Sequence, residues 1–184
     1  MIEQKIIPVI SDWKNFEKFL KSKQTWCVLI DFHINFMEEL FLQLHAHEKK
    51  GIVHMDLTTG IQNDQFGTQF MCQKYHVDGI ISTKPKAIEA AMKNHCISIL
   101  RVFMMDTRSL KRNGELAKSL APDYVEVLPA ITPHVVSLLR EYCDVNIIGG
   151  GLVRSLEDIK ACLQQGMKAI TTSSIELCEW EEIV

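Results

Sequence analysis

The amino-acid sequence predicts an α/β fold, a small TIM-like (β/α)8 barrel with parallel strands, formed as a single domain by residues 1–184. The first observation is that short apolar, β-branched runs recur eight times, each with the length of a strand rather than a helix. The second is that segments of helical length separate these runs. The third is that glycines close the seventh run and hydroxyl residues close the eighth, as in the phosphate site common at the top of such barrels.

The expected strands alternate with segments that carry helix start signals. The strands are expected at residues 6–10, 26–30, 52–57, 79–83, 97–103, 124–128, 145–148 and 169–172. Helices are expected at residues 13–20, 37–47, 87–92, 135–139 and 159–163, after start signals at Asp12, Asn35, Thr83 with Pro85, Thr132 with Pro133, and Ser155 with Asp158. Dividing 184 residues by eight leaves 23 for each strand–helix unit, which is short because such barrels typically need ~250 residues. An open, doubly wound sheet is therefore the structural alternative.

Composition places the chain among soluble globular proteins and excludes disordered and fibrous classes. Hydrophobic residues make up 47% and charged residues 23%, and no apolar run approaches the ~20 residues that span a bilayer. The first residues lack the apolar core of a signal peptide, so we expect a cytoplasmic protein without membrane contact. The six cysteines show no C-x-x-C spacing and are expected to be reduced thiols.

Polar side chains interrupt the predicted strands at positions that face the barrel interior. Strand residues alternate between the interior and the helix layer, and several polar residues fall on the inner side or at strand ends, where barrel sites are built. The expected ligand-binding residues are Asp31, His54, Asp56, Lys84, Arg101 and Glu126. A charged group inside a barrel must be paired or must meet solvent or ligand. Two interpretations stay open, a polar ligand pocket and a buried ion network that only closes the barrel.

The ends of the last two strands offer donors for an anion. Gly150 and Gly151 expose backbone N–H groups, and Thr172 and Ser173 add hydroxyls one unit later, so we expect these four residues to bind phosphate. A tight turn is the alternative explanation of the glycines. No metal-ligand spacing and no catalytic motif is present, so we expect no metal, no cofactor and no catalytic residue.

Several motifs make the sequence resemble a known family almost from end to end. The motifs are IPVI at residues 7–10, HMDL at 54–57, DGIISTK at 78–84, RVFMMD at 101–106, PDYVEVLP at 122–129, IGGGLVR at 148–154 and TTS at 171–173. In this combination and spacing the chain resembles the glycerol uptake operon antiterminator regulatory proteins. The resemblance implies a barrel-like regulator that senses glycerol 3-phosphate and binds a leader mRNA, relieving premature termination of a glycerol-catabolic operon.

The resemblance also implies which residues hold the effector. Carried over by position, they are Asp31, His54, Asp56, Lys84, Arg101, Glu126, Gly150, Gly151, Thr172 and Ser173, which coincide with the positions derived above. Three positions depart from residues common in the family, namely Leu100, Thr107 and Ala130. Of these, Ala130 is expected to alter a loop over the pocket.

The amino-acid composition does not indicate an RNA-binding surface. A net charge of −3 gives no support to a nucleic-acid partner, so RNA binding must depend on a few basic residues. We expect Arg108, Lys111 and Arg112 to contact RNA, with Lys14, Lys18, Lys21 and Lys23 or the pair Lys49 and Lys50 as alternatives. The competing interpretation of each group is a solvated helix face. A homo-oligomer would assemble such small patches into a larger one.

Two rival functions remain. The first is an isomerase or lyase that acts on a small phosphorylated substrate, with His54 or Glu126 as the acid or base. The second is a module that binds a small molecule and passes the signal to a protein partner.

Overall fold

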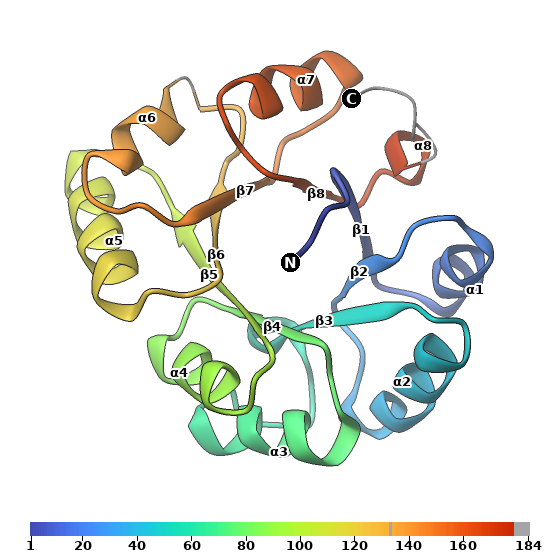
Figure 1. Ribbon diagram of the computed structural model, residues 1–184. Coiled ribbons are helices and arrows are strands. Elements are labelled where there is room, and N and C mark those ends of the chain that lie inside the picture. The colour runs from blue at the N-terminus through green and yellow to red at the C-terminus, as the bar shows by residue number, and fades with distance from the viewer. Residues whose placement is uncertain (133, 179–184) are drawn as a thin grey trace.

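Eight parallel strands close into a barrel, and helices surround it (Figure 1). The computed structural model describes residues 1–132 and 134–178. Each strand pairs with the next along the chain, and the eighth pairs with the first. The predicted barrel is therefore confirmed, and the open-sheet alternative is wrong.

The strands follow the predicted order with small shifts at their ends. They are β1 (Ile6–Ile10), β2 (Trp26–Leu29), β3 (Lys50–His54), β4 (Gly79–Ser82), β5 (Ile97–Phe103), β6 (Tyr124–Leu128), β7 (Asn146–Gly150) and β8 (Ile170–Thr172). The largest difference is in the third strand, which ends at His54. Residues Met55–Leu57 form the 3-10 turn η2 instead, and within it Asp56 accepts hydrogen bonds from Thr83.

Helices alternate with the strands around the barrel. They are α1 (Trp13–Lys21), α2 (Met37–Ala46), α3 (Gln65–Tyr75), α4 (Pro85–Lys93), α5 (Thr107–Leu120), α6 (Val135–Arg140), α7 (Leu156–Gln164) and α8 (Ile175–Cys178), with a 3-10 turn η1 (Ile34–Phe36) before α2. Among the described residues, none of these helices is both long and apolar enough to cross a membrane.

Several of the predicted helix starts are present. Asp12 caps α1 by accepting from the Asn15 backbone N–H at 2.9 Å, and Ser155 and Asp158 form a capping box at α7. Three predictions are wrong. Asn35 lies inside η1, and Phe36, which makes no side-chain cap hydrogen bond, stands at the N-cap of α2. Lys84 rather than Thr83 stands at the N-cap of α4, because the Thr83 hydroxyl is bonded to Asp56. His134 rather than Thr132 stands at the N-cap of α6, and the Pro133 predicted beside it lies outside the described residues.

The apolar core has two layers, one on each side of the strands. The outer layer packs the strands against the helices, whereas the inner layer fills the lower barrel with Ile7, Val28, Ile52, Ile81, Ile99, Tyr124, Ile148 and Ala169. At the bottom, the Ile2 backbone N–H donates to the Tyr124 hydroxyl at 2.8 Å. Two residues further along several strands, the inner face becomes polar. The carboxyl-terminal mouth of the barrel is therefore where a polar site is positioned.

Candidate ligand site at the barrel mouth

A buried ion pair links two neighbouring strands at the mouth. Arg101 on β5 and Glu126 on β6 are register partners, and Arg101 Nε donates to Glu126 Oε2. The side chain of Glu126 is fully buried. Its other oxygen, Oε1, accepts from Thr171 Oγ1 on β8 at 2.7 Å. Both oxygens of the buried carboxylate are thus satisfied, as a buried charge requires.

The glycine run at the end of β7 makes room for this cluster. A Cβ atom on Gly150 would lie 2.6 Å from Thr171 Oγ1 and 2.9 Å from Glu126 Oε1. On the helix side, a Cβ atom on Gly149 would lie 2.7 Å from the Cβ of Ala130. Gly151 has a φ of +73°, in the left-handed region that favours glycine. Gly150 therefore leaves room for the ion-pair cluster, Gly149 allows close packing on the helix side, and Gly151 allows a left-handed backbone. The tight-turn interpretation fits Gly151 alone.

His54, at the end of β3, brings an unsatisfied polar group into the same region. Its side chain is 2% exposed, and neither ring nitrogen has a hydrogen-bond partner among the described residues. Burial, and then the positive charge of Arg101, lower its pKa to about 4, although Asp56 acts in the opposite direction. His54 is therefore a neutral imidazole near pH 7, and its two buried ring nitrogens are available to a ligand or water.

Asp56 approaches His54 from the turn after β3 rather than from the strand itself. Its Oδ2 lies 3.6 Å from His54 Nδ1, and the Thr83 backbone N–H donates to the same oxygen at 3.0 Å. Burial would raise the pKa of Asp56, but the hydrogen bonds from Thr83 outweigh it and hold the pKa below its usual value. Asp56 is thus an ionised acceptor beside the imidazole.

Arg101 keeps donors for a further partner. Its Nε is bonded to Glu126, while no hydrogen bond from its two terminal nitrogens is recorded within residues 1–132 and 134–178. Two parallel N–H donors of a guanidinium match a phosphate or carboxylate. Arg101 also acts on the pKa of His54, so it connects the two halves of the polar cluster. We call Arg101, Glu126, Gly150, Thr171, His54 and Asp56 the mouth ring.

Other predicted site residues lie outside the mouth ring. Asp31 and Lys84 are exposed, and no contact of either with the ring is recorded in the described part of the chain. Ser173 is exposed, whereas Thr172 is buried and its Oγ1 accepts from the Ser174 backbone N–H at 3.2 Å. Strand alternation places Thr171 rather than Thr172 on the inner face, because Ala169 faces inward and Thr171 therefore does too.

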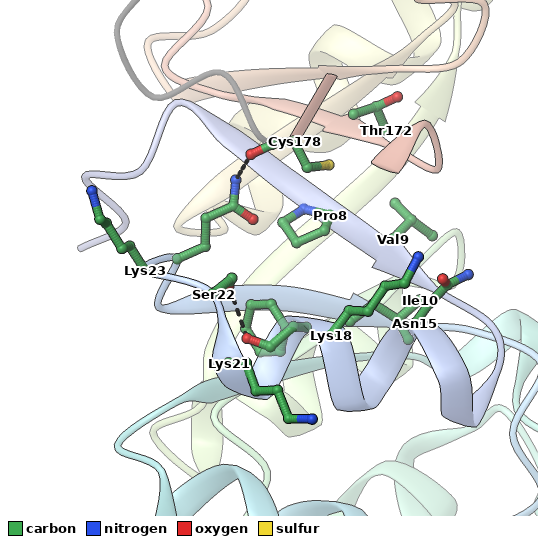
Figure 2. Close-up of a pocket in the computed structure, with 12 residues that line it drawn as sticks. Pro8, Val9, Ile10, Asn15, Lys18, Lys21, Ser22, Lys23, Thr172 and Cys178 are labelled. Carbon is green, nitrogen blue, oxygen red and sulfur yellow. Dashed lines mark hydrogen bonds between the residues drawn. The ribbon is translucent and has the colours of Figure 1, made fainter. Parts of the chain in front are cut away.

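Thr172 instead lines a cavity outside the barrel, between β1, α1 and α8 (Figure 2). This cavity has a volume of about 560 Å³, and Pro8 and Lys18 also line it. A second cavity, of about 540 Å³, lies at the opposite end of the barrel around Tyr124 and Lys168. Neither cavity contains a residue of the mouth ring. Phosphate binding by Gly151, Thr172 and Ser173 remains a prediction.

Sequence reasoning missed Thr171 and Thr83. The signal for Thr171 was the inward Ala169 two residues earlier, which a row of adjacent hydroxyl residues obscured. Thr83 was assigned to helix capping, although its hydroxyl donates a hydrogen bond to Asp56.

No group of three or more potential metal ligands occurs in the part of the chain that the structure describes.

The basic residues proposed for RNA lie in different settings. Arg108, Lys111 and Arg112 are exposed in the first half of α5, which begins at the mouth end of the barrel. Lys111 Nζ lies 3.9 Å from Glu115 Oε1, a weak exposed pair. Lys49, one of the alternatives, is held by the carbonyl oxygens of Ser22 and Gln24. That lysine therefore has a structural role.

Comparisons with known proteins agree with each other. The family model described as glycerol-3-phosphate responsive antiterminator matches residues 6–178. The structure of the glycerol uptake operon antiterminator regulatory protein from Listeria monocytogenes is 32% identical, with a TM-score of 0.92 over 99% of this chain and 97% of that chain. A glycerol uptake operon antiterminator-related protein from Thermotoga maritima is 29% identical, with a TM-score of 0.83 over 96% of this chain and 98% of that one.

Proteins with lower sequence identity to this chain give less information about its function. The uncharacterized protein YgcP from Escherichia coli is 26% identical over 169 residues, which are 92% of this chain and 88% of that protein. Aldolases with 11% and 12% identity share the barrel at TM-scores of 0.72 and 0.70. At such low identity the likeness shows the fold alone.

Proposed function

Because the chain belongs to the family of glycerol-3-phosphate responsive antiterminators, we propose that its mouth ring binds glycerol 3-phosphate and that the bound protein engages a leader mRNA. The observation that carries the ligand half is the buried, unpartnered imidazole of His54 beside the spare donors of Arg101. A buried polar group without a partner is costly, and a small polar ligand removes that cost. A ligand that carries hydroxyls and an anionic group would suit both His54 and Arg101.

Each residue of the mouth ring has a role in this proposal. The terminal nitrogens of Arg101 bind the phosphate, together with backbone N–H groups at Gly150 and Gly151. His54 and Asp56 bind the hydroxyls of the glycerol moiety. Glu126 does not contact the ligand; it fixes the orientation of the Arg101 guanidinium through Nε, and Thr171 fixes Glu126.

The signal to RNA follows from linkage. A ligand shifts the protein towards an RNA-competent state only as far as it binds that state more tightly than the other. The residues that bind the phosphate lie on β5 and β7, whose following loops lead into α5 and α7. Ligand binding therefore orders loops that carry basic residues at the mouth.

A thermal-shift series tests the ligand half. Glycerol 3-phosphate should raise the melting temperature, with a stabilisation of ~2.7 kcal/mol at 100 times its dissociation constant. Glycerol and inorganic phosphate, each alone, should give much smaller shifts because each satisfies only half of the ring. Equal shifts from glycerol and glycerol 3-phosphate would show that the anion plays no part.

The enzyme alternative is tested separately. A neutral His54 beside Arg101 is also suited to proton transfer, and this observation keeps an isomerase or lyase as the second candidate. Pure protein incubated with phosphorylated trioses should give no product if the chain is only a regulator. Turnover that is lost in His54→Gln would instead support the enzyme.

A further inference from the structure

Phe103 follows Arg101 on the inner face of β5. The residues Ile97 and Ile99 of β5 belong to the inner layer of the barrel, whereas Leu100 and Val102 pack against the helices. The same alternation places Arg101 and then Phe103 on the inner face, one position further toward the mouth. Phe103 is nevertheless 48% exposed. A half-exposed aromatic side chain thus follows Arg101 at the same strand end.

Three more exposed apolar side chains follow the neighbouring strands. They are Met105 after β5, Ile131 after β6 and Leu152 after β7, and together with Phe103 we call them the mouth rim. Backbone hydrogen bonds hold these strand ends side by side. The Met104 N–H donates to the Leu128 carbonyl at 2.9 Å, and the Ala130 N–H donates to the Gly150 carbonyl at 2.8 Å.

Leu152 is an unusual member of the mouth rim. It has a φ of +60°, a conformation that is strained for a bulky residue, and its side chain is 59% exposed. A strained backbone that presents an apolar side chain to solvent gains nothing for the isolated fold. Exposed apolar side chains at the ends of three adjacent strands are typical of an interaction site.

Cations border the mouth rim. Arg108, Arg112 and Arg154 are exposed, and no ion pair of theirs is recorded among the described residues. The nearest acidic groups are engaged in helix capping, since Asp106 accepts from the Ser109 N–H at 2.7 Å and Asp158 accepts from the Ser155 N–H at 3.0 Å. Arg112 and Arg154 nevertheless lie close enough to Asp106 and Asp158 to lower the pKa of these carboxyl groups. The surface therefore combines exposed apolar side chains with exposed arginines that form no salt bridge among the described residues.

We infer that the mouth rim and its three arginines are the surface that contacts RNA, and that they take a single-stranded loop rather than a duplex. Unstacked bases pack on Phe103 and its apolar neighbours, and the arginines bind the phosphates, which is the combination that single-stranded RNA requires. A basic surface without exposed apolar side chains would instead suit the phosphate backbone of a duplex. This inference rests on the proposed function and locates its RNA partner.

The position of Phe103 also suggests how the ligand is coupled to RNA. Because Arg101 and Phe103 are neighbours on the inner face of β5, glycerol 3-phosphate bound to Arg101 lies beneath the ring of Phe103. Ligand and RNA then share one strand end, and no long-range change in the barrel is needed. Ligand binding at Arg101 should therefore strengthen RNA binding through Phe103 in particular.

Binding of the leader RNA of a glycerol uptake operon, measured by fluorescence anisotropy with and without glycerol 3-phosphate, tests this inference. Phe103→Ala should weaken binding roughly ten- to hundredfold, the usual effect of losing one stacked base. Its matched control is Phe66→Ala, which removes another exposed phenylalanine from α3, away from the rim. Arg112→Glu should also weaken binding, whereas Lys118→Glu, an equal charge change at the far end of α5, should have little effect.

The outcomes separate the inference from the proposed function. If the wild type responds to glycerol 3-phosphate in the thermal-shift series but never binds the leader RNA, the RNA half of the proposed function fails. If the wild type binds RNA and Phe103→Ala and Arg112→Glu match their controls, the mouth rim is not the contact surface. If Phe103→Ala changes the oligomeric state in size-exclusion chromatography and leaves RNA binding intact, the rim joins two copies of the chain, which also overturns the inference.

Discussion

The imidazole of His54 is neutral inside the protein, and this makes stability depend on pH. Its pKa is lowered to about 4 in the fold, from 6.5 in the unfolded chain, so the unfolded chain binds the additional proton between these values. The free energy of unfolding should thus fall by about 2–3 kcal/mol between pH 7 and pH 4.5, by an estimate of 1.36 kcal/mol for each pKa unit. Urea unfolding at both pH values measures this loss. His54→Gln should remove most of it, whereas His47→Gln, at an exposed histidine, should retain it. Equal pH dependence in both variants would mean that His54 does not titrate in this way.

The ion pair between Arg101 and Glu126 makes a second prediction at the residue scale. Arg101→Met leaves a fully buried carboxylate with only the Thr171 hydroxyl, so the variant should lose about 3–5 kcal/mol of stability. The double variant Arg101→Met/Glu126→Gln removes the stranded charge and should recover most of that loss. Denaturant unfolding of both proteins measures the difference. A double variant no more stable than the single one would show that the buried charge is not the cause.

At the scale of the element, the end of β7 sets how closely three strands approach at the mouth. In Gly150→Ala the new methyl group would lie against Thr171 and Glu126, so it should separate their hydrogen bond, cost about 1–3 kcal/mol of stability and abolish the thermal shift with glycerol 3-phosphate. Gly151→Ala is the comparison, because its Cβ would lie 3.5 Å from Leu128 and meet no ring atom. It should cost only about 1 kcal/mol, from its positive φ. Similar ligand responses in the two variants would contradict the geometry of the ring.

At the scale of the whole molecule, the sequence predicts the architecture better than the site. Eight apolar runs were enough for the barrel, and strand alternation correctly placed Arg101 and Glu126 inside. The alternation failed where a strand ended earlier than its apolar pattern, because Asp56 lies in a turn whose geometry is set by Thr83. It also left the choice between adjacent hydroxyls open, since the sequence does not mark Ala169 as inward-facing, which in the structure places Thr171 rather than Thr172 against Glu126. Contacts between strands far apart in the sequence decide such cases, and a single sequence does not contain them.

We expect glycerol 3-phosphate to bind the mouth ring through Arg101. Isothermal titration of glycerol 3-phosphate into the wild type and into Arg101→Met/Glu126→Gln tests it most directly, because the double variant loses the guanidinium without retaining a stranded buried charge. The wild type should show one binding site per chain, and a double variant that remains folded should show no measurable binding. Binding of equal affinity by the two folded proteins would contradict it.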